Sequence, residues 1–69
     1  MKISQLLHSM DKDDEIIIND ENKPINKMQL FRGKVREIKK DDPINHVHVN
    51  LCFACDDTMV VLVGERSKR

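Results

Sequence analysis

The last third of the sequence limits the fold most, because two strand-like segments flank a pair of aspartates. In residues 46–55, HVHVNLCFAC, every second residue is apolar, which is typical of a strand with one buried face. The apolar positions are Val47, Val49, Leu51 and Phe53, and the alternating positions are His46, His48, Asn50 and Cys52. Residues 58–63, TMVVLV, are apolar on both faces, as in a central strand. With a turn at Asp56-Asp57, the segment predicts a β-hairpin that ends at Gly64.

The first twenty residues predict one helix followed by one strand. Four apolar residues recur at the spacing of one helix face, and Ser4 precedes them as a suitable N-cap. These residues are Ile3, Leu6, Leu7 and Met10. The run MDKDD ends the helix, because Asp side chains compete for backbone groups and acid is unfavourable at a helix C-terminus. The β-branched run EIII then predicts a strand over residues 14–19.

Residues 25–40 are compatible with two interpretations. Their apolar side chains at Met28, Phe31, Val35 and Ile38 are spaced three, four and three residues apart, as on one helix face. Gly33 favours a break instead, because an interior glycine costs about 1 kcal/mol in either element. We therefore expect a strand over 27–32, a turn at Gly33 and a short helix over 34–40. A single helix over 25–40 is the alternative.

Together these elements predict an α+β fold: a short N-terminal helix packed on a small, mostly antiparallel sheet of about four strands, with a second short helix and a C-terminal β-hairpin. We expect one domain over residues 1–64 and a charged, frayed tail over residues 65–69. In a chain of 69 residues, burial of apolar surface stabilises the folded state by on the order of 100 kcal/mol, and the conformational entropy lost on folding costs about the same. A partner, a metal or self-association would supply a margin of stability.

Charge is segregated along a chain whose formal net charge is zero. Residues 11–22 sum to −5, residues 23–40 to +6 and residues 41–57 to −4. The basic residues of the middle block are Lys23, Lys27, Arg32, Lys34, Arg36, Lys39 and Lys40. Such a block either steers a partner to one basic face or forms a solvated rim around the core.

The residue types that bind metals gather at His46, His48, Cys52 and Cys55. On a straight strand His46 and Cys52 lie about 20 Å apart, so they cannot share a zinc ion within one chain. His46 and His48 remain as metal candidates, although exposed histidines beside a partly buried cysteine pair are the simpler interpretation. Cys52 and Cys55 precede two aspartates instead of opening a helix, which disfavours redox catalysis. We expect no metal and no other cofactor.

The composition also disfavours an enzyme. The carboxylates come in runs on turns, whereas a catalytic pair needs an enclosed site that separates two pKa values. The sequence has no Trp, no Tyr and two Gly, which leaves little pocket wall and no phosphate-binding loop. No apolar run approaches 18 residues, and MKISQLLHSM lacks the apolar region of a signal peptide, so we expect no membrane association.

The opening MKISQLLHSMDKDDEIIIND and the later LFRGKVREI resemble small proteins of unknown function from phages and prophages of Gram-positive bacteria. The resemblance covers residues 2–38 and consists of a helix, a DxExxIxD segment, a turn and an L-[FY]-R-G-x-V segment that enters a short helix. It implies an accessory phage gene product in the cytoplasm of a bacterial host. That class includes inhibitors of host defence such as anti-CRISPR proteins.

We therefore expect a non-enzymatic protein that binds and occludes a host protein, for example as an anti-CRISPR-like inhibitor. The expected partner-binding residues are Met28, Leu30, Phe31, Arg32, Lys34 and Arg36. The apolar members would anchor the partner and the basic members would steer it.

Two alternatives remain open. A nucleic-acid-associated module would use the same basic block, although Phe31 alone is not a stacking platform. A homo-oligomer would sequester a ligand between chains, near His46, His48 and Asn50.

Overall fold

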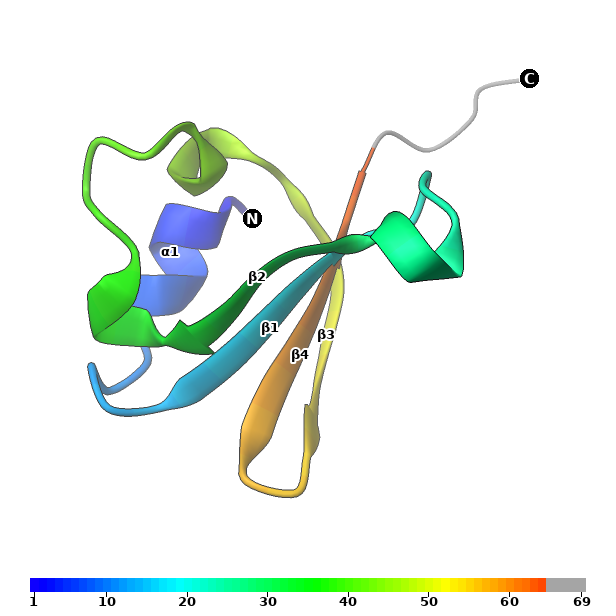
Figure 1. Ribbon diagram of the computed structural model, residues 1–69. Helices are drawn as coiled ribbons and strands as arrows, with labels where there is room; N and C mark the ends of the chain where they lie inside the picture. The colour runs from blue at the N-terminus through cyan, green and yellow to red at the C-terminus, as the bar shows by residue number, and fades with distance from the viewer. Residues whose placement is uncertain (65–69) are drawn as a thin grey trace.

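β-branched residues form the centre of the sheet in the computed structural model, which describes residues 1–64 (Figure 1). The central strands are β1, Glu15–Asp20, and β4, Thr58–Val63, and both were predicted within one residue. The edge strands are β2, Gln29–Lys34, and β3, Val49–Cys55, which gives the strand order β2-β1-β4-β3. The fold is α+β, and the predicted tail over residues 65–69 lies outside the described residues.

The sheet is mixed, which corrects the expected, mostly antiparallel arrangement in its centre. β1 and β4 pair in parallel, with Ile18 opposite Val61, whereas β1 pairs antiparallel with β2 and β3 pairs antiparallel with β4. β3 and β4 form the C-terminal hairpin around Asp56-Asp57, and Asp56 adopts a positive φ of 49°. Both central strands carry apolar side chains on both faces, and this composition does not encode the direction in which strands pair.

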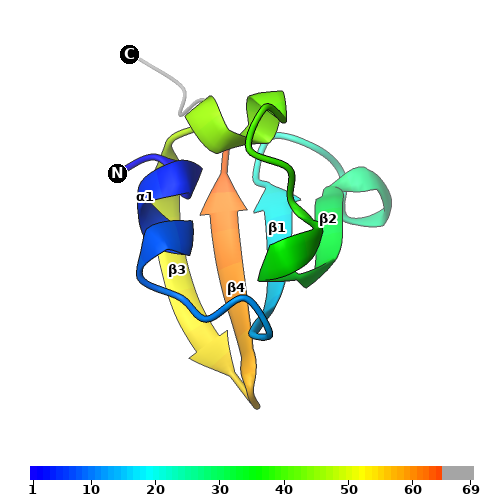
Figure 2. The same ribbon diagram turned by 90° about the vertical axis from the view of Figure 1, so that its left-hand side faces the viewer.

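One face of the sheet is covered by α1, Ile3–His8, and by short 3₁₀ turns (Figure 2). The buried apolar side chains are Ile3, Leu6, Ile16, Ile18, Val35, Val61 and Val63. The predicted apolar helix face is confirmed, since Leu7 and Met10 pack against this core. The N-cap is Lys2 instead of Ser4, and the Lys2 backbone N–H donates to Gln5 Oε1 at 2.8 Å. Among residues 1–64, no helix has the length and apolar content to cross a bilayer.

The alternative of a single helix over residues 25–40 is wrong. The segment contains η1, Ile25–Lys27, then β2, then η2, Val35–Glu37, where η denotes a 3₁₀ helix. The turn expected at Gly33 is also wrong, because Gly33 lies inside β2 opposite Ile16. The second helix, expected over 34–40, is reduced to η2. Phe31, Val35 and Ile38 do contact the core, but a strand and a tight turn place them there, so their helix-like spacing was misleading.

β3 contains a bulge that reverses the predicted orientation of its side chains. The register with β4 shifts between Val49 and Leu51, which leaves Asn50 without an opposite residue. Cys52 consequently packs against the core, whereas Leu51 is 52% exposed and Phe53 is 46% exposed. The prediction that Leu51 and Phe53 lie on the buried face is therefore wrong.

Side-chain hydrogen bonds hold this bulge against the end of β4. Asn50 Nδ2 donates to the Gly64 carbonyl at 2.7 Å and to Glu21 Oε2 at 2.9 Å. Gly64 has a φ of +122°, and a Cβ there would lie 2.5 Å from Asp20 Oδ1. The predicted end of the strand at Gly64 is confirmed.

A buried asparagine organises the connection from η2 to β3. Asn45 lies in η3, Pro43–His46, and is 6% exposed. Its Nδ2 donates to the carbonyls of Lys39 at 2.7 Å, Lys40 at 3.1 Å and Asp42 at 3.1 Å. One amide thus ties the whole loop to η3 and completes the layer over the core.

Neighbouring isoleucines on opposite faces of β1 provide a test of this packing. Ile18→Ala removes a fully buried side chain and is expected to lower the free energy of unfolding by about 2–5 kcal/mol. Ile17→Ala, at a half-buried position on the other face, should cost less than half as much. Urea unfolding followed by far-UV circular dichroism measures both. Equal losses would contradict the one-sided core.

Candidate functional site

The face of the sheet opposite α1 is the candidate site, and we call it the open face. Figure 1 places α1, η2 and η3 on the same side of the sheet. Because side chains alternate along a strand, those between the buried positions point to the other side. The open face comprises Leu30, Arg32 and Lys34 on β2, Glu15, Ile17 and Asn19 on β1, Thr58, Val60 and Leu62 on β4, and Leu51, Phe53 and Cys55 on β3.

Strand register arranges these residues in rows across the sheet. The middle row consists of Arg32, Ile17, Val60 and Phe53. One neighbouring row consists of Gln29, Asn19, Leu62 and Leu51, and Leu30 is the extra residue at the bulge of β2 between Gln29 and Phe31. The other row is polar and consists of Lys34, Glu15, Thr58 and Cys55. The apolar side chains therefore form one continuous patch with a polar row along one end.

Exposure distinguishes this patch from isolated surface residues. Leu30 is 40% exposed, and Leu51 and Phe53 are exposed to a similar degree or more. Ile17, Val60 and Leu62 are half-buried, and none of the six packs against the core. Contiguous exposed apolar side chains rimmed by polar groups are typical of an interaction surface.

Basic groups lie on the β2 side of the patch. Arg32 is opposite Ile17, and Lys34 is opposite Glu15, whose Oε1 accepts a hydrogen bond from Thr58 Oγ1 at 3.4 Å. Arg32 and Lys34 are both exposed. The open face can thus offer an apolar centre and two cations along one border.

The structure brings together three of the six predicted partner-binding residues. Leu30, Arg32 and Lys34 share the open face. Phe31 points to the other side of β2, where it packs against the core, and Met28 is a half-buried residue after η1. The remaining residue, Arg36, lies in η2.

Arg36 is engaged within the chain instead of facing a partner from β2. Its guanidinium forms an ion pair with Asp13, and its backbone N–H donates to the Lys12 carbonyl at 3.0 Å. These contacts attach η2 to the turn before β1.

Sequence reasoning missed the larger part of the patch. Val60 and Leu62 were assigned to a strand that is apolar on both faces, but neither they nor Ile17 were considered as partner-binding residues, and the bulge at Asn50 concealed Leu51 and Phe53. The signal was present in EIII and TMVVLV, because strands that are apolar on both faces need a cover on both sides.

The histidines and cysteines do not converge. His46 ends η3, His48 forms an isolated β-bridge with Lys2, and both are exposed. Cys52 faces the core and Cys55 faces the open side of β3. Within residues 1–64, no group of three or more His, Cys, Asp or Glu side chains is arranged to hold a metal ion.

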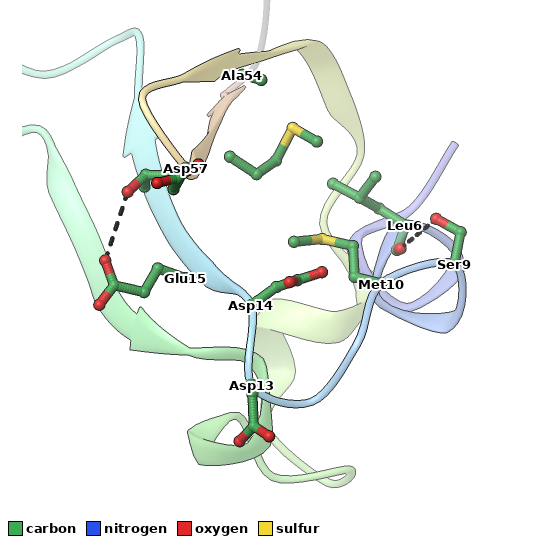
Figure 3. Close-up of a pocket in the computed structure, with 10 residues that line it drawn as sticks. Leu6, Ser9, Met10, Asp13, Asp14, Glu15, Ala54 and Asp57 are labelled. Carbon is green, nitrogen blue, oxygen red and sulfur yellow. Dashed lines mark hydrogen bonds between the residues drawn. The ribbon is translucent and has the colours of Figure 1, made fainter.

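A concave feature separate from the open face lies between α1 and the hairpin end of the sheet (Figure 3). Its lining residues are Leu6, Ser9, Met10, Asp13, Asp14, Glu15, Ala54, Asp57, Thr58 and Met59. Asp14 Oδ2 accepts the Asp11 N–H at 3.0 Å, and Asp13 and Glu15 accept the hydrogen bonds described above. Asp13 and Asp14 therefore fasten the turn before β1, and Glu15 joins β1 to β4.

Comparisons with known proteins add no relative: no protein-family model, no curated protein and no solved structure matches the chain. The candidate site consequently rests on geometry alone.

The two phenylalanines of the chain test the difference between the faces. Phe31→Ala is expected to lower the free energy of unfolding by about 2 kcal/mol, because Phe31 packs against the core. Phe53→Ala should cost less than about 1 kcal/mol, because its ring lies on the open face. Chemical denaturation of both variants provides the measurement. A larger loss for Phe53→Ala would reverse our assignment of the faces.

Proposed function

We propose that the chain is a non-enzymatic protein-binding module whose open face docks on a protein of a bacterial host. The observation that carries this proposal is the continuous apolar patch of Leu30, Ile17, Val60, Leu62, Leu51 and Phe53. Anchoring side chains in a desolvated centre contribute most of the binding energy in protein interfaces, and a polar rim surrounds them. The open face has both parts.

The chemistry of the face specifies its partner. Arg32 and Lys34 border the patch on one side, so a complementary surface carries acidic residues beside an apolar centre. Opposite charges accelerate the encounter and fix its orientation, while the apolar contact supplies affinity. A nucleic acid fits less well, because a polyanionic backbone leaves the apolar side chains without a counterpart.

Two further points support a host protein as the occupant. Residues 2–38 resemble small phage and prophage proteins of unknown function, a class that includes inhibitors of host defence. In the concave feature beside α1, Asp13, Asp14 and Glu15 hold parts of the chain together, which favours a binding role over acid–base catalysis. Inhibition would follow from occlusion of the host surface, and an inhibitor of bacterial defence is one protein of this kind.

Charge reversal on the open face tests the proposal. The bait is the intact chain, presented to a bacterial lysate treated with nuclease, and bound proteins are quantified by mass spectrometry. Arg32→Glu combined with Lys34→Glu should weaken capture of the specific partner at least tenfold, because it reverses the charge beside the patch.

A matched control uses the same basic block outside the face. Lys39→Glu combined with Lys40→Glu makes the same change in net charge on exposed residues of the loop after η2. This control should retain the partner. Equal capture by both double variants would refute the placement of the site, and a partner that disappears with nuclease treatment would favour the nucleic-acid alternative.

A further inference from the structure

The outer edge of β3 is only partly covered. β3 is the last strand of the sheet and pairs with β4 alone. The N-terminal segment runs along the beginning of this edge: the Val49 N–H donates to the Met1 carbonyl at 2.7 Å, and the Ile3 N–H donates to the Val47 carbonyl at 2.9 Å. Among residues 1–64, no segment continues this cover over residues 51–55.

Backbone groups of alternate residues on this edge point away from the sheet. In an antiparallel pair, residues alternate between those that bond to the neighbouring strand and those that face outward. The two-residue loop Asp56-Asp57 makes Cys55 and Thr58 the bonded pair that closes the hairpin. Phe53 and Leu51 then also form backbone hydrogen bonds with β4, whereas the backbone N–H and C=O groups of Ala54 and Cys52 face outward.

Beyond the bulge at Asn50, β3 lacks the features that protect an edge strand from pairing. From Val49 to Cys55 it contains no Lys, no Pro and no charged residue. β2, the opposite edge, carries Arg32 and Lys34, which repel a second copy of themselves. Of the two edges, β3 is the one that accepts an identical strand.

We propose that two copies of the chain pair through their β3 edges, antiparallel and about a two-fold axis at Phe53. Only this centre lets all five free residues pair, since Leu51 then lies opposite Cys55 of the second copy and Cys52 lies opposite Ala54. Phe53 lies opposite its own counterpart on the open face, where cross-strand aromatic pairs are stabilising. The result is one continuous sheet, to which each copy contributes its four strands.

Charge complementarity supports the same register. Beyond Leu51, the acidic loop Asp56-Asp57 of one copy reaches the place where the N-terminal segment of the other copy lies along Val49. Lys2 and His48 are exposed there and are joined by a β-bridge. Each end of the pairing thus sets two carboxylates beside a cation, and the two-fold axis provides this contact twice.

The pairing has a limited strength and a defined geometry. Five residues of edge make a small interface, in the range of weak association, so the dimer forms at high protein concentration. The two-fold axis is perpendicular to the sheet, which puts both open faces on the same side.

Sedimentation equilibrium of the purified chain tests the dimer. The average mass should rise from 8.1 kDa toward twice that value between micromolar and millimolar concentration. Ala54→Pro removes an outward N–H and should weaken association at least tenfold, while Ala54→Val keeps this N–H and should associate like the original chain. A constant monomer mass, or equal association of the two variants, would overturn the proposal.

Disulfide trapping tests the register without dependence on the proline variant. In a Cys52→Ala, Cys55→Ser background, Phe53→Cys places two thiols opposite each other at a Cα separation of about 4.5 Å. Leu51→Cys places them about 13 Å apart, beyond the reach of a disulfide. With oxidised glutathione, only the Phe53→Cys chain should form a covalent dimer, and trapping of Leu51→Cys with similar yield would refute this register.

These experiments contain no host protein, so their outcome is separate from that of the proposed function. The Arg32→Glu, Lys34→Glu double variant should still dimerise, because both residues lie at the far edge of the sheet. Loss of the dimer in this variant but not in Ala54→Pro would instead indicate stacking of open faces and would overturn edge pairing.

Discussion

One covering layer has to serve a sheet whose two central strands carry apolar side chains on both faces. α1 contains six residues, and together with the 3₁₀ turns η2 and η3 it buries Ile16, Ile18, Val61 and Val63. The chain provides no equivalent layer in residues 1–64 for Ile17, Val60 and Leu62 on the other side. The open face follows from this shortage, and the proposed contact with a host protein depends on it.

Much of the fold could be predicted because local patterns identify single elements. The helix face from Ile3 to Met10 and both central strands followed from periodicity and β-branching. The parallel pairing of β1 with β4 was not predictable, because pairing direction depends on contacts between residues far apart in the chain. The prediction for residues 25–40 was partly wrong for another reason. Phe31 and Val35 reach the core from a strand and a tight turn as well as they would from one helix face.

The candidate site was predictable on one strand only. Leu30, Arg32 and Lys34 were predicted to bind a partner, although Lys34 was assigned to a helix; the structure puts Arg32 and Lys34 on one face of β2, with Leu30 at the bulge beside them. The larger apolar part comes from β1, β3 and β4, so it depends on strand order and register. The two ends of this surface differ in chemistry: the β2 end carries cations suited to an acidic partner, and the β3 end is uncharged and suited to a copy of itself.

The bulge at Asn50 sets which residues of β3 face the core and which face the open side of the sheet. Because of this bulge, Cys52 and Ala54 lie on the core side of β3, and Leu51, Phe53 and Cys55 lie on the open side. Substitutions at Leu51, Phe53 and Cys55 can accumulate while Cys52 keeps its place against the core. Deletion of Asn50 would remove the bulge but leave Leu51 opposite Leu62 and Cys52 opposite Val61, so both sets would keep their faces. What the chain would lose is the pair of hydrogen bonds from the Asn50 side chain to Gly64 and Glu21. The inserted residue thus fastens the start of β3 to the end of β4.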